Sequence, residues 1–186
     1  MIGYAFTGSF CTLSRSLVEL NKLVSSGYDV LPIMSENVSM TDTRFFLAHD
    51  FISEVENICK KKIVNTVKDA EPLGPKTPLE SLIIAPCTGN TLAKIANGIT
   101  DTSVTMAAKA HLRTDRPLLV ALASNDAMSQ NLGNIAKLIG RKSVYFVPLS
   151  QDDPIGKPHS LVADFSRLTE AFYAMGENRQ IRPLFI

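Results

Sequence analysis

Residues 81–98 constrain the fold more than any other part of this 186-residue chain. An apolar run at 82–85 predicts a buried strand that ends at Pro86, and a helical pattern of apolar residues begins at Leu92. In a parallel α/β sheet, a turn of this kind lies at the carboxyl end of its strand, where ligands bind. The polar side chains that can cap the helix and also face a ligand are Thr88, Asn90 and Thr91. An ordinary capped turn between strand and helix is the alternative.

The same alternation of strand and helix continues along the whole chain. Further strands are predicted at 1–6, 28–34, 117–123 and 143–147, with a short one at 63–67. Helices are predicted at 13–24, 43–62, 102–112, 128–139 and 161–175. Polar or proline-rich loops are predicted at 35–42, 68–78 and 148–160. We therefore predict an α/β fold with three layers, a Rossmann-like, doubly wound and mostly parallel sheet. The length suits one domain over 1–186, with a loose tail at about 176–186.

The strands of such a sheet should bring their following turns to one edge. Besides Pro86 and the three residues named above, these turns contain Thr7, Gly8, Ser9, Ser35, Ala123 and Ser124. The turns are rich in small polar residues and poor in charge, which suits a polar cofactor that carries one phosphate. The first turn matches neither the G-x-G-x-x-G dinucleotide fingerprint nor a P-loop.

The composition excludes several classes of function. Lys plus Arg is 19 and Asp plus Glu is 18, so the near-neutral charge predicts neither a nucleic-acid nor a membrane partner. No apolar run approaches the roughly 18 residues of a membrane span, and a cytoplasmic location is expected. The three cysteines form no C-x-x-C pair and the three histidines have no zinc-site spacing, so no metal site is predicted.

No catalytic residue can be identified from the residues alone, because the chain contains no G-x-S-x-G elbow or other catalytic constellation. Arg44 and Lys76 lie in or beside loops and are candidates for binding an anionic substrate. Solvated surface charges are the alternative for both.

The sequence APCTGNTLAKIANG at 85–98 resembles a signature of the homo-oligomeric, flavin-containing cysteine decarboxylase-like family. The turn at 7–9 resembles that family's phosphate-binding turn. The resemblance implies that FMN binds at the strand ends. Gly8, Ser9 and Ser35 would then hold its phosphate or ribityl chain, and the ring or phosphate would contact Thr88, Asn90 and Thr91. Thr7, Pro86, Ala123 and Ser124 complete the predicted cofactor site.

Five further segments resemble the family of bacterial dipicolinate synthase B subunits. They are TDTRF (41–45), EPLGPK (71–76), MAAKAHLRTDRP (106–117), SNDA (124–127) and YFVPLSQDDP (145–154). This resemblance implies oxidation of a dihydro- or hydroxytetrahydro-dipicolinate to dipicolinate, in the mother cell of a spore-forming bacterium. It implies a partner A subunit that binds NAD(P), and a homo-oligomer, either a trimer or a dodecamer. Arg44, Lys76 and Asn125 are the predicted contacts to the dicarboxylate substrate, with Lys109 and Arg113 as further candidate cations behind Arg44 and Lys76.

The chain departs from the decarboxylases at two places. Their Pro-x-Met-Asn motif is replaced by ALASND at 121–126, and their catalytic histidine has His49 as its nearest candidate. Cysteine decarboxylation is therefore disfavoured. A flavin prenyltransferase or another FMN-dependent decarboxylase-like enzyme, and a scaffold subunit that has lost the cofactor, stay open as alternatives.

Overall fold

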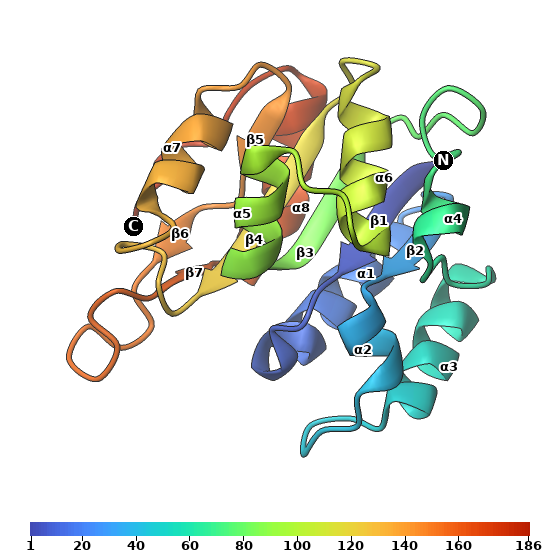
Figure 1. The fold of residues 1–186 in the computed structure, drawn as a ribbon, viewed down its shortest axis with the longest axis horizontal. Helices are drawn as coiled ribbons and strands as arrows, with labels where there is room; N and C mark the ends of the chain where they lie inside the picture. The colour runs from blue at the N-terminus through green and yellow to red at the C-terminus, as the bar shows by residue number, and fades with distance from the viewer.

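The computed structural model describes residues 1–186, which form a seven-stranded mixed sheet between two layers of helices (Figure 1). The strand order is β2-β1-β3-β4-β7-β6, and β5 also pairs with β4. The strands are β1 (Ile2–Phe6), β2 (Val30–Met34), β3 (Leu82–Thr88), β4 (Leu118–Ser124), β5 (Val144–Phe146), β6 (Leu149–Ser150) and β7 (Leu161–Ala163). The first five strands pair in parallel, whereas β7 is antiparallel to both β4 and β6. The prediction of a mostly parallel, Rossmann-like α/β sheet is confirmed.

Helices cover both faces of the sheet. One layer holds α1 (Leu13–Ser25) and α8 (Leu168–Gly176), and α3 (Ala48–Cys59) packs beside α1 near β2. The other layer holds α4 (Val67–Ala70), α5 (Gly89–Asn97), α6 (Ser103–Leu112) and α7 (Leu132–Ile139) (Figure 1). Three short elements complete the chain: η1 (Phe10–Thr12), α2 (Glu36–Met40) and η2 (Phe165–Arg167). The result is the three-layer arrangement of a doubly wound fold.

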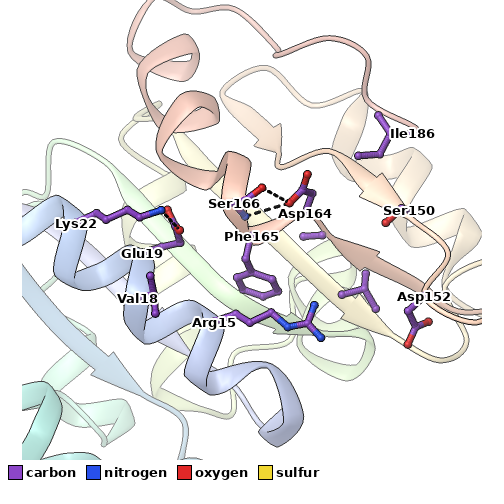
Figure 2. A pocket seen from close by; sticks show the side chains of 12 residues that line it. Arg15, Val18, Glu19, Lys22, Ser150, Asp152, Asp164, Phe165, Ser166 and Ile186 are labelled. Atoms are coloured by element: carbon purple, nitrogen blue, oxygen red, sulfur yellow. Dashed lines mark hydrogen bonds and ion pairs between the residues drawn. The ribbon is translucent and has the colours of Figure 1, made fainter.

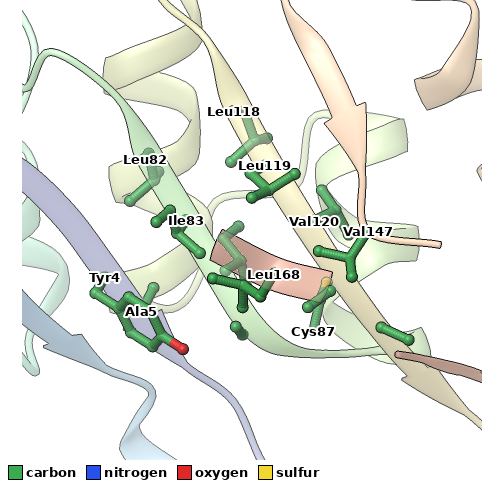
Figure 3. Close-up of a cluster of buried hydrophobic side chains, with 14 of the residues drawn as sticks. Tyr4, Ala5, Leu82, Ile83, Cys87, Leu118, Leu119, Val120, Val147 and Leu168 are labelled. Atoms are coloured by element: carbon green, nitrogen blue, oxygen red, sulfur yellow. The ribbon is translucent and has the colours of Figure 1, made fainter. Parts of the chain in front are cut away.

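The core is one cluster of 50 buried residues that runs along both faces of the central strands. Figure 3 shows apolar side chains of β3 and β4, such as Ile83 and Leu119, meeting Leu168 of α8 and Val147. All seven residues of β4 are buried, as expected for a parallel strand that is covered by helices on both sides. This rigid centre fixes the positions of the turns that follow β1, β3 and β4.

Strand β3 does not end at Pro86, as the sequence analysis predicted, but continues to Thr88. Its pairing with β4 shifts register between Ile84 and Cys87, so the proline lies at an irregularity of the ladder. Such a shift accommodates a residue without an N–H group, which a regular ladder position would need.

Several predicted element boundaries are also wrong. The expected loop 35–42 contains α2. Helix α3 begins at Ala48 rather than at 43, because the Thr43 hydroxyl accepts hydrogen bonds from the N–H groups of Phe45 and Phe46 and so holds a turn before the helix. The expected strand 63–67 is reduced to one bridge between Val64 and Ile33. The expected loop 148–160 contains strand β6. The expected helix 161–175 begins with strand β7 and η2, so that α8 starts only at Leu168. Helix α7 starts at Leu132 rather than at 128.

The C-terminal tail is fixed to the sheet, contrary to the expectation that it is loose. Ile181 and Leu184 are buried. The N–H of Leu149 donates to the carbonyl of Leu184 at 2.7 Å, and the N–H of Ile186 donates to the carbonyl of Leu149 at 2.9 Å. The tail therefore acts as an additional edge segment beside β6.

Candidate functional site

Two adjoining cavities lie at the carboxyl ends of β1, β2, β3 and β4, where the sequence analysis placed the site. We call the first the hydroxyl cavity; its volume is about 560 Å³ and its lining is Thr7, Gly8, Phe10, Ser35, Glu36, Asn37, Thr41, Thr88, Asn90, Thr91, Lys94, Asp101 and Thr102. We call the second the charged cavity; its volume is about 530 Å³. Its charged members are Arg15, Arg44, Asp126, Asp152 and Lys157, beside residues 8–12, 88–90 and 123–125. Gly8, Phe10, Thr88 and Asn90 line both cavities, so the two form one cleft.

The structure brings most of the predicted site residues to this cleft. Those that line it are Thr7, Gly8, Ser9, Ser35, Thr88, Asn90, Thr91, Ala123 and Ser124, together with Arg44 and Asn125. Pro86 is buried and lines neither cavity. Lys76 is exposed on the segment before β3, near the amino ends of the strands, where the N–H of Glu80 donates to the carbonyl of Met1. This protomer therefore does not bring Lys76 into the cleft.

Thr7 joins the turns that follow β1 and β3. Its hydroxyl donates to the carbonyl of Pro86 at 2.8 Å and accepts from the N–H of Thr88 at 2.9 Å. Thr7 is almost fully buried, so its hydroxyl serves the packing of the two turns. Pro86 thus contributes through its carbonyl, as an acceptor behind the cleft.

The hydroxyl cavity contains a polar atom that the protein leaves unpaired. Ser35 is the N-cap of α2 and is 7% exposed, yet its hydroxyl has no hydrogen-bond partner. The neighbouring Glu36 accepts from the N–H of Ser103 at 3.0 Å, while its other carboxylate oxygen is buried without a partner. Buried polar groups are normally paired. A polar ligand in this cavity fits the residues present, because it would supply the missing partner of Ser35.

Helix α5 begins at the same place. The Thr88 hydroxyl accepts from the N–H of Thr91 at 3.2 Å and so caps the helix. The cap leaves further N–H groups of the first turn without a partner inside the helix. Together with Gly8, which lines both cavities, this helix start suits a phosphate or an electron-rich ring edge.

The charged cavity contains cations of two kinds. Lys157 is paired with Asp152 at 3.0 Å, and hydrogen bonds from Ser160 and then Lys157 hold the pKa of Asp152 below its usual range. Arg15 and Arg44 have no carboxylate partner, although the Arg44 guanidinium lies 4.8 Å from the centre of the Phe45 ring. Two guanidinium groups are therefore available to an anionic ligand.

Arg15 and Lys157 were not predicted as site residues. Arg15 occupies the first turns of the helix that follows β1, so its position at this edge was implied by the predicted strand–turn–helix unit. Lys157 lies on a loop whose path the sequence did not indicate. Arg15 also borders a third cavity, of about 540 Å³, between α1 and the segment from β7 to η2 (Figure 2).

Gly89 permits an unusually close packing at the floor of the cleft. A Cβ atom at this position would overlap Ser124 Oγ and would lie 2.7 Å from Asn131 Nδ2 and 2.8 Å from Asp126 Oδ1. These three side chains form one cluster, since Ser124 and Asn131 both donate to the Asp126 carboxylate. The hydrogen bond from Ser124 is the main cause that lowers the pKa of Asp126, so the carboxylate is held ionised.

The cluster continues outward as a line of side-chain amides. Asn134 donates to Asn131 at 3.0 Å, Asn97 donates to Asn134 at 3.1 Å, and Lys137 donates to Asn97 at 2.9 Å. The line connects α5 and α7 and links the exposed end of Lys137 to the floor of the cleft.

The remaining candidates lie elsewhere. His49 is exposed at the start of α3 and does not line the cleft. Cys87, which lies in β3 next to the turn and was not proposed as a site residue, is fully buried, and burial raises the pKa of its thiol, so it is not a thiolate nucleophile. Lys109 and Arg113 line a separate small cavity. No cluster of three or more His, Cys, Asp or Glu side chains is placed to hold a metal ion. None of the helices combines the length and apolar character that crossing a bilayer requires.

The chain is similar to known proteins in both sequence and structure. The family model described as Flavoprotein matches residues 1–165. The chain is 37% identical over 185 residues to the dipicolinate synthase B subunit of Bacillus subtilis (strain 168), covering 100% of this chain and 92% of that protein. It is 41% identical, with a TM-score of 0.91, to the crystal structure of the dipicolinate synthase B subunit from Bacillus halodurans C, covering 100% of this chain and 95% of that one. The dodecameric FMN-dependent Ubix-like decarboxylase from Escherichia coli O157:H7 shares the fold, with a TM-score of 0.62, 20% identity and 79% coverage of each chain.

Proposed function

The chain belongs to the flavoprotein family, among the dipicolinate synthase B subunits, and we propose that it is an FMN-binding subunit that acts with an A subunit. The pair oxidises a dihydro- or hydroxytetrahydro-dipicolinate to dipicolinate, for spores formed in the mother cell. The NAD(P) used in the reaction is bound by the A subunit. The chain forms one flavoprotein domain over 1–186 and assembles into a trimer or dodecamer, for which the dodecameric relative is the support.

The observation that carries this proposal is the unpaired Ser35 hydroxyl inside a cavity lined by hydroxyl groups and a helix start. Gly8, Ser9 and Ser35 hold the phosphate or ribityl chain, and Thr88, Asn90 and Thr91 hold the ring or phosphate. Ala123 and Ser124 lie at the floor beneath them. Hydroxyl groups and the free N–H groups of a helix start can bind a phosphate and a polar chain, which suits FMN.

The charged cavity binds the substrate. Bound FMN supplies the redox chemistry, and the protein supplies binding, orientation and electrostatics. Arg15 and Arg44 pair with the two carboxylates, and Asn125 offers an amide to the same ligand. The ionised Asp126 keeps the floor in place through Ser124 and Asn131. Because the two cavities share four lining residues, the substrate lies beside the cofactor.

A titration of the purified protein with FMN, followed by flavin absorbance, tests the proposal. We expect a shifted flavin band and saturable one-to-one binding, which Ser35→Ala weakens by about tenfold because a hydrogen bond to a charged phosphate is lost. Turnover is then measured with and without the A subunit. Absence of binding at high FMN would instead favour the scaffold function.

Replacing Arg44 by alanine should raise the KM for the dicarboxylate by roughly tenfold and leave FMN affinity within about twofold, since a solvent-exposed guanidinium contributes a modest charged hydrogen bond. Steady-state kinetics with the A subunit present measures the change. Lys76→Ala is the matched control: it removes one exposed cation from the same chain, and we expect it to leave KM unchanged because Lys76 lies outside the cleft. Equal effects of the two substitutions would remove Arg44 from the substrate site.

A flavin prenyltransferase is the second candidate. The sequence shows no evident cluster of basic residues for a prenyl phosphate, but the fold gathers Arg15, Arg44 and Lys157 in one cavity. Incubation of the protein with FMN that has been reduced by dithionite, and with dimethylallyl phosphate, distinguishes the two functions, because the reduced flavin can be alkylated with release of inorganic phosphate. Formation of a prenylated flavin, detected by mass spectrometry, would favour the transferase.

A further inference from the structure

A small cavity of about 160 Å³ lies between α5 and α6, away from the cleft. It shares no lining residue with the hydroxyl or charged cavity. Its lining is Ile95, Gly98, Ile99, Thr100, Thr105, Lys109, Leu112, Arg113 and Arg141. The cations come from three places in the chain: the last turn of α6, the residue that follows α6, and the segment after α7.

The charge of this cavity is not balanced by the protein. Lys109, Arg113 and Arg141 are all exposed, and none of the three forms an ion pair or a side-chain hydrogen bond. No Asp or Glu belongs to the lining. In the cleft, by contrast, Lys94 and Lys157 each have an aspartate partner within 3.0 Å. Three like charges that face one cavity repel each other, and an anion between them would relieve this repulsion.

The rest of the lining indicates what kind of anion fits. Ile95 and Leu112 are buried and Ile99 is half-exposed, so part of the wall is apolar. A guanidinium presents a planar fork that matches a carboxylate or a phosphate with two parallel hydrogen bonds, and the apolar wall favours a carboxylate carried by an apolar body. The volume is below that of pockets for drug-sized ligands, which are roughly 300–1,000 Å³, and so favours a compact molecule over a chain segment.

We propose that this cavity is a second binding site for a compact dicarboxylate with an apolar body, formed by Lys109, Arg113 and Arg141. A site of this chemistry, outside the cleft, would let the protein bind such an anion while the cleft is occupied. The existence of the site is independent of the flavin. The choice of probe rests on the proposed function, in which the product is a ring with two carboxylates.

Isothermal titration of the full-length protein with pyridine-2,6-dicarboxylate tests the proposal. We expect two sites per chain in the wild type. The double variant Arg113→Ala/Arg141→Ala should lose one of them or weaken it by about tenfold or more, and Arg44→Ala should affect only the other. Lys142→Ala is the matched control, since it removes an exposed cation next to Arg141 that does not line the cavity. Thermal melting and FMN titration check that each variant is folded.

The outcomes separate this inference from the proposed function. Loss of a site in the double variant but not in Lys142→Ala supports the inference, even if Arg44→Ala has no effect and the substrate site in the cleft is abandoned. Binding that responds only to Arg44→Ala, or equally to Lys142→Ala, would overturn it. Competition by inorganic phosphate as strong as that by benzene-1,3-dicarboxylate would overturn the assignment to dicarboxylates.

Discussion

Gly89→Ala is expected to lower both the stability of the protein and its affinity for FMN. The added methyl group would crowd Ser124, Asp126 and Asn131, which are bonded to each other and cannot all move away. Overpacking of this kind costs about 1–3 kcal/mol. Because the cluster forms the floor of the cleft, we expect FMN binding to weaken by about tenfold as the floor is displaced. Urea denaturation and flavin titration measure the two effects.

Gly133→Ala provides the control for this substitution. Gly133 lies inside α7, and a Cβ atom there would meet nothing within 4 Å. Alanine has a helix propensity about 1 kcal/mol better than glycine, so this variant should be more stable than the wild type and should bind FMN normally. If both glycine variants behaved alike, close packing at Gly89 would not be a requirement of the site.

Phe51→Ala is expected to be the most destabilising single change considered for this protein, by about 3–5 kcal/mol. Phe51 of α3 is 1% exposed and contacts the ring of Phe6 edge-on, with 5.3 Å between ring centres, and the ring of Phe46 at 4.9 Å. The substitution would leave a cavity between α3 and the end of β1. A loss of this size is a large part of the roughly 5–15 kcal/mol that stabilises a typical domain. The midpoint of urea denaturation measures it.

The consequence of Phe51→Ala should extend to the cleft. Phe46 packs on Phe51 and belongs to the turn that carries Arg44, so loosening this contact should raise the KM for the substrate as well. Phe45→Ala is the control for the ring itself. Phe45 is 44% exposed, and its removal should change stability by about 0.5 kcal/mol or less. Equal destabilisation by the two substitutions would contradict this account of the core.

The sequence allowed the parallel part of the sheet to be predicted because its strands are apolar runs and its helices have a clear period. It did not allow β6 and β7 to be predicted. The short apolar run at 161–163 is equally compatible with a strand and with the start of a helix. Only its antiparallel pairing with β4 and β6 identifies it as a strand. The fixed tail was missed for the same reason, since its contacts are made with Leu149, which is distant in sequence.

The site residues, like the strands, could be predicted from the sequence only in part. Small polar residues at predicted strand ends reached the cleft because the topology of the sheet takes them there. Charged residues were harder to place, because a loop can carry them to either edge. Lys76 lies on the segment that leads into β3 and so remains near the amino ends of the strands, whereas Arg15 follows β1 and reaches the cleft.

The line of amides behind the cleft has a direction. The ammonium of Lys137 can only donate a hydrogen bond and the carboxylate of Asp126 can only accept one, so every amide between them is oriented the same way. At the inner end, Ser124 uses its single proton on Asp126. What Ser124 can offer to a molecule in the cleft is therefore a lone pair. The Asp126 carboxylate thus determines that Ser124 accepts N–H and O–H groups and disfavours carbonyl and carboxylate oxygens, which leaves the carboxylates of a substrate to the guanidinium groups of Arg15 and Arg44.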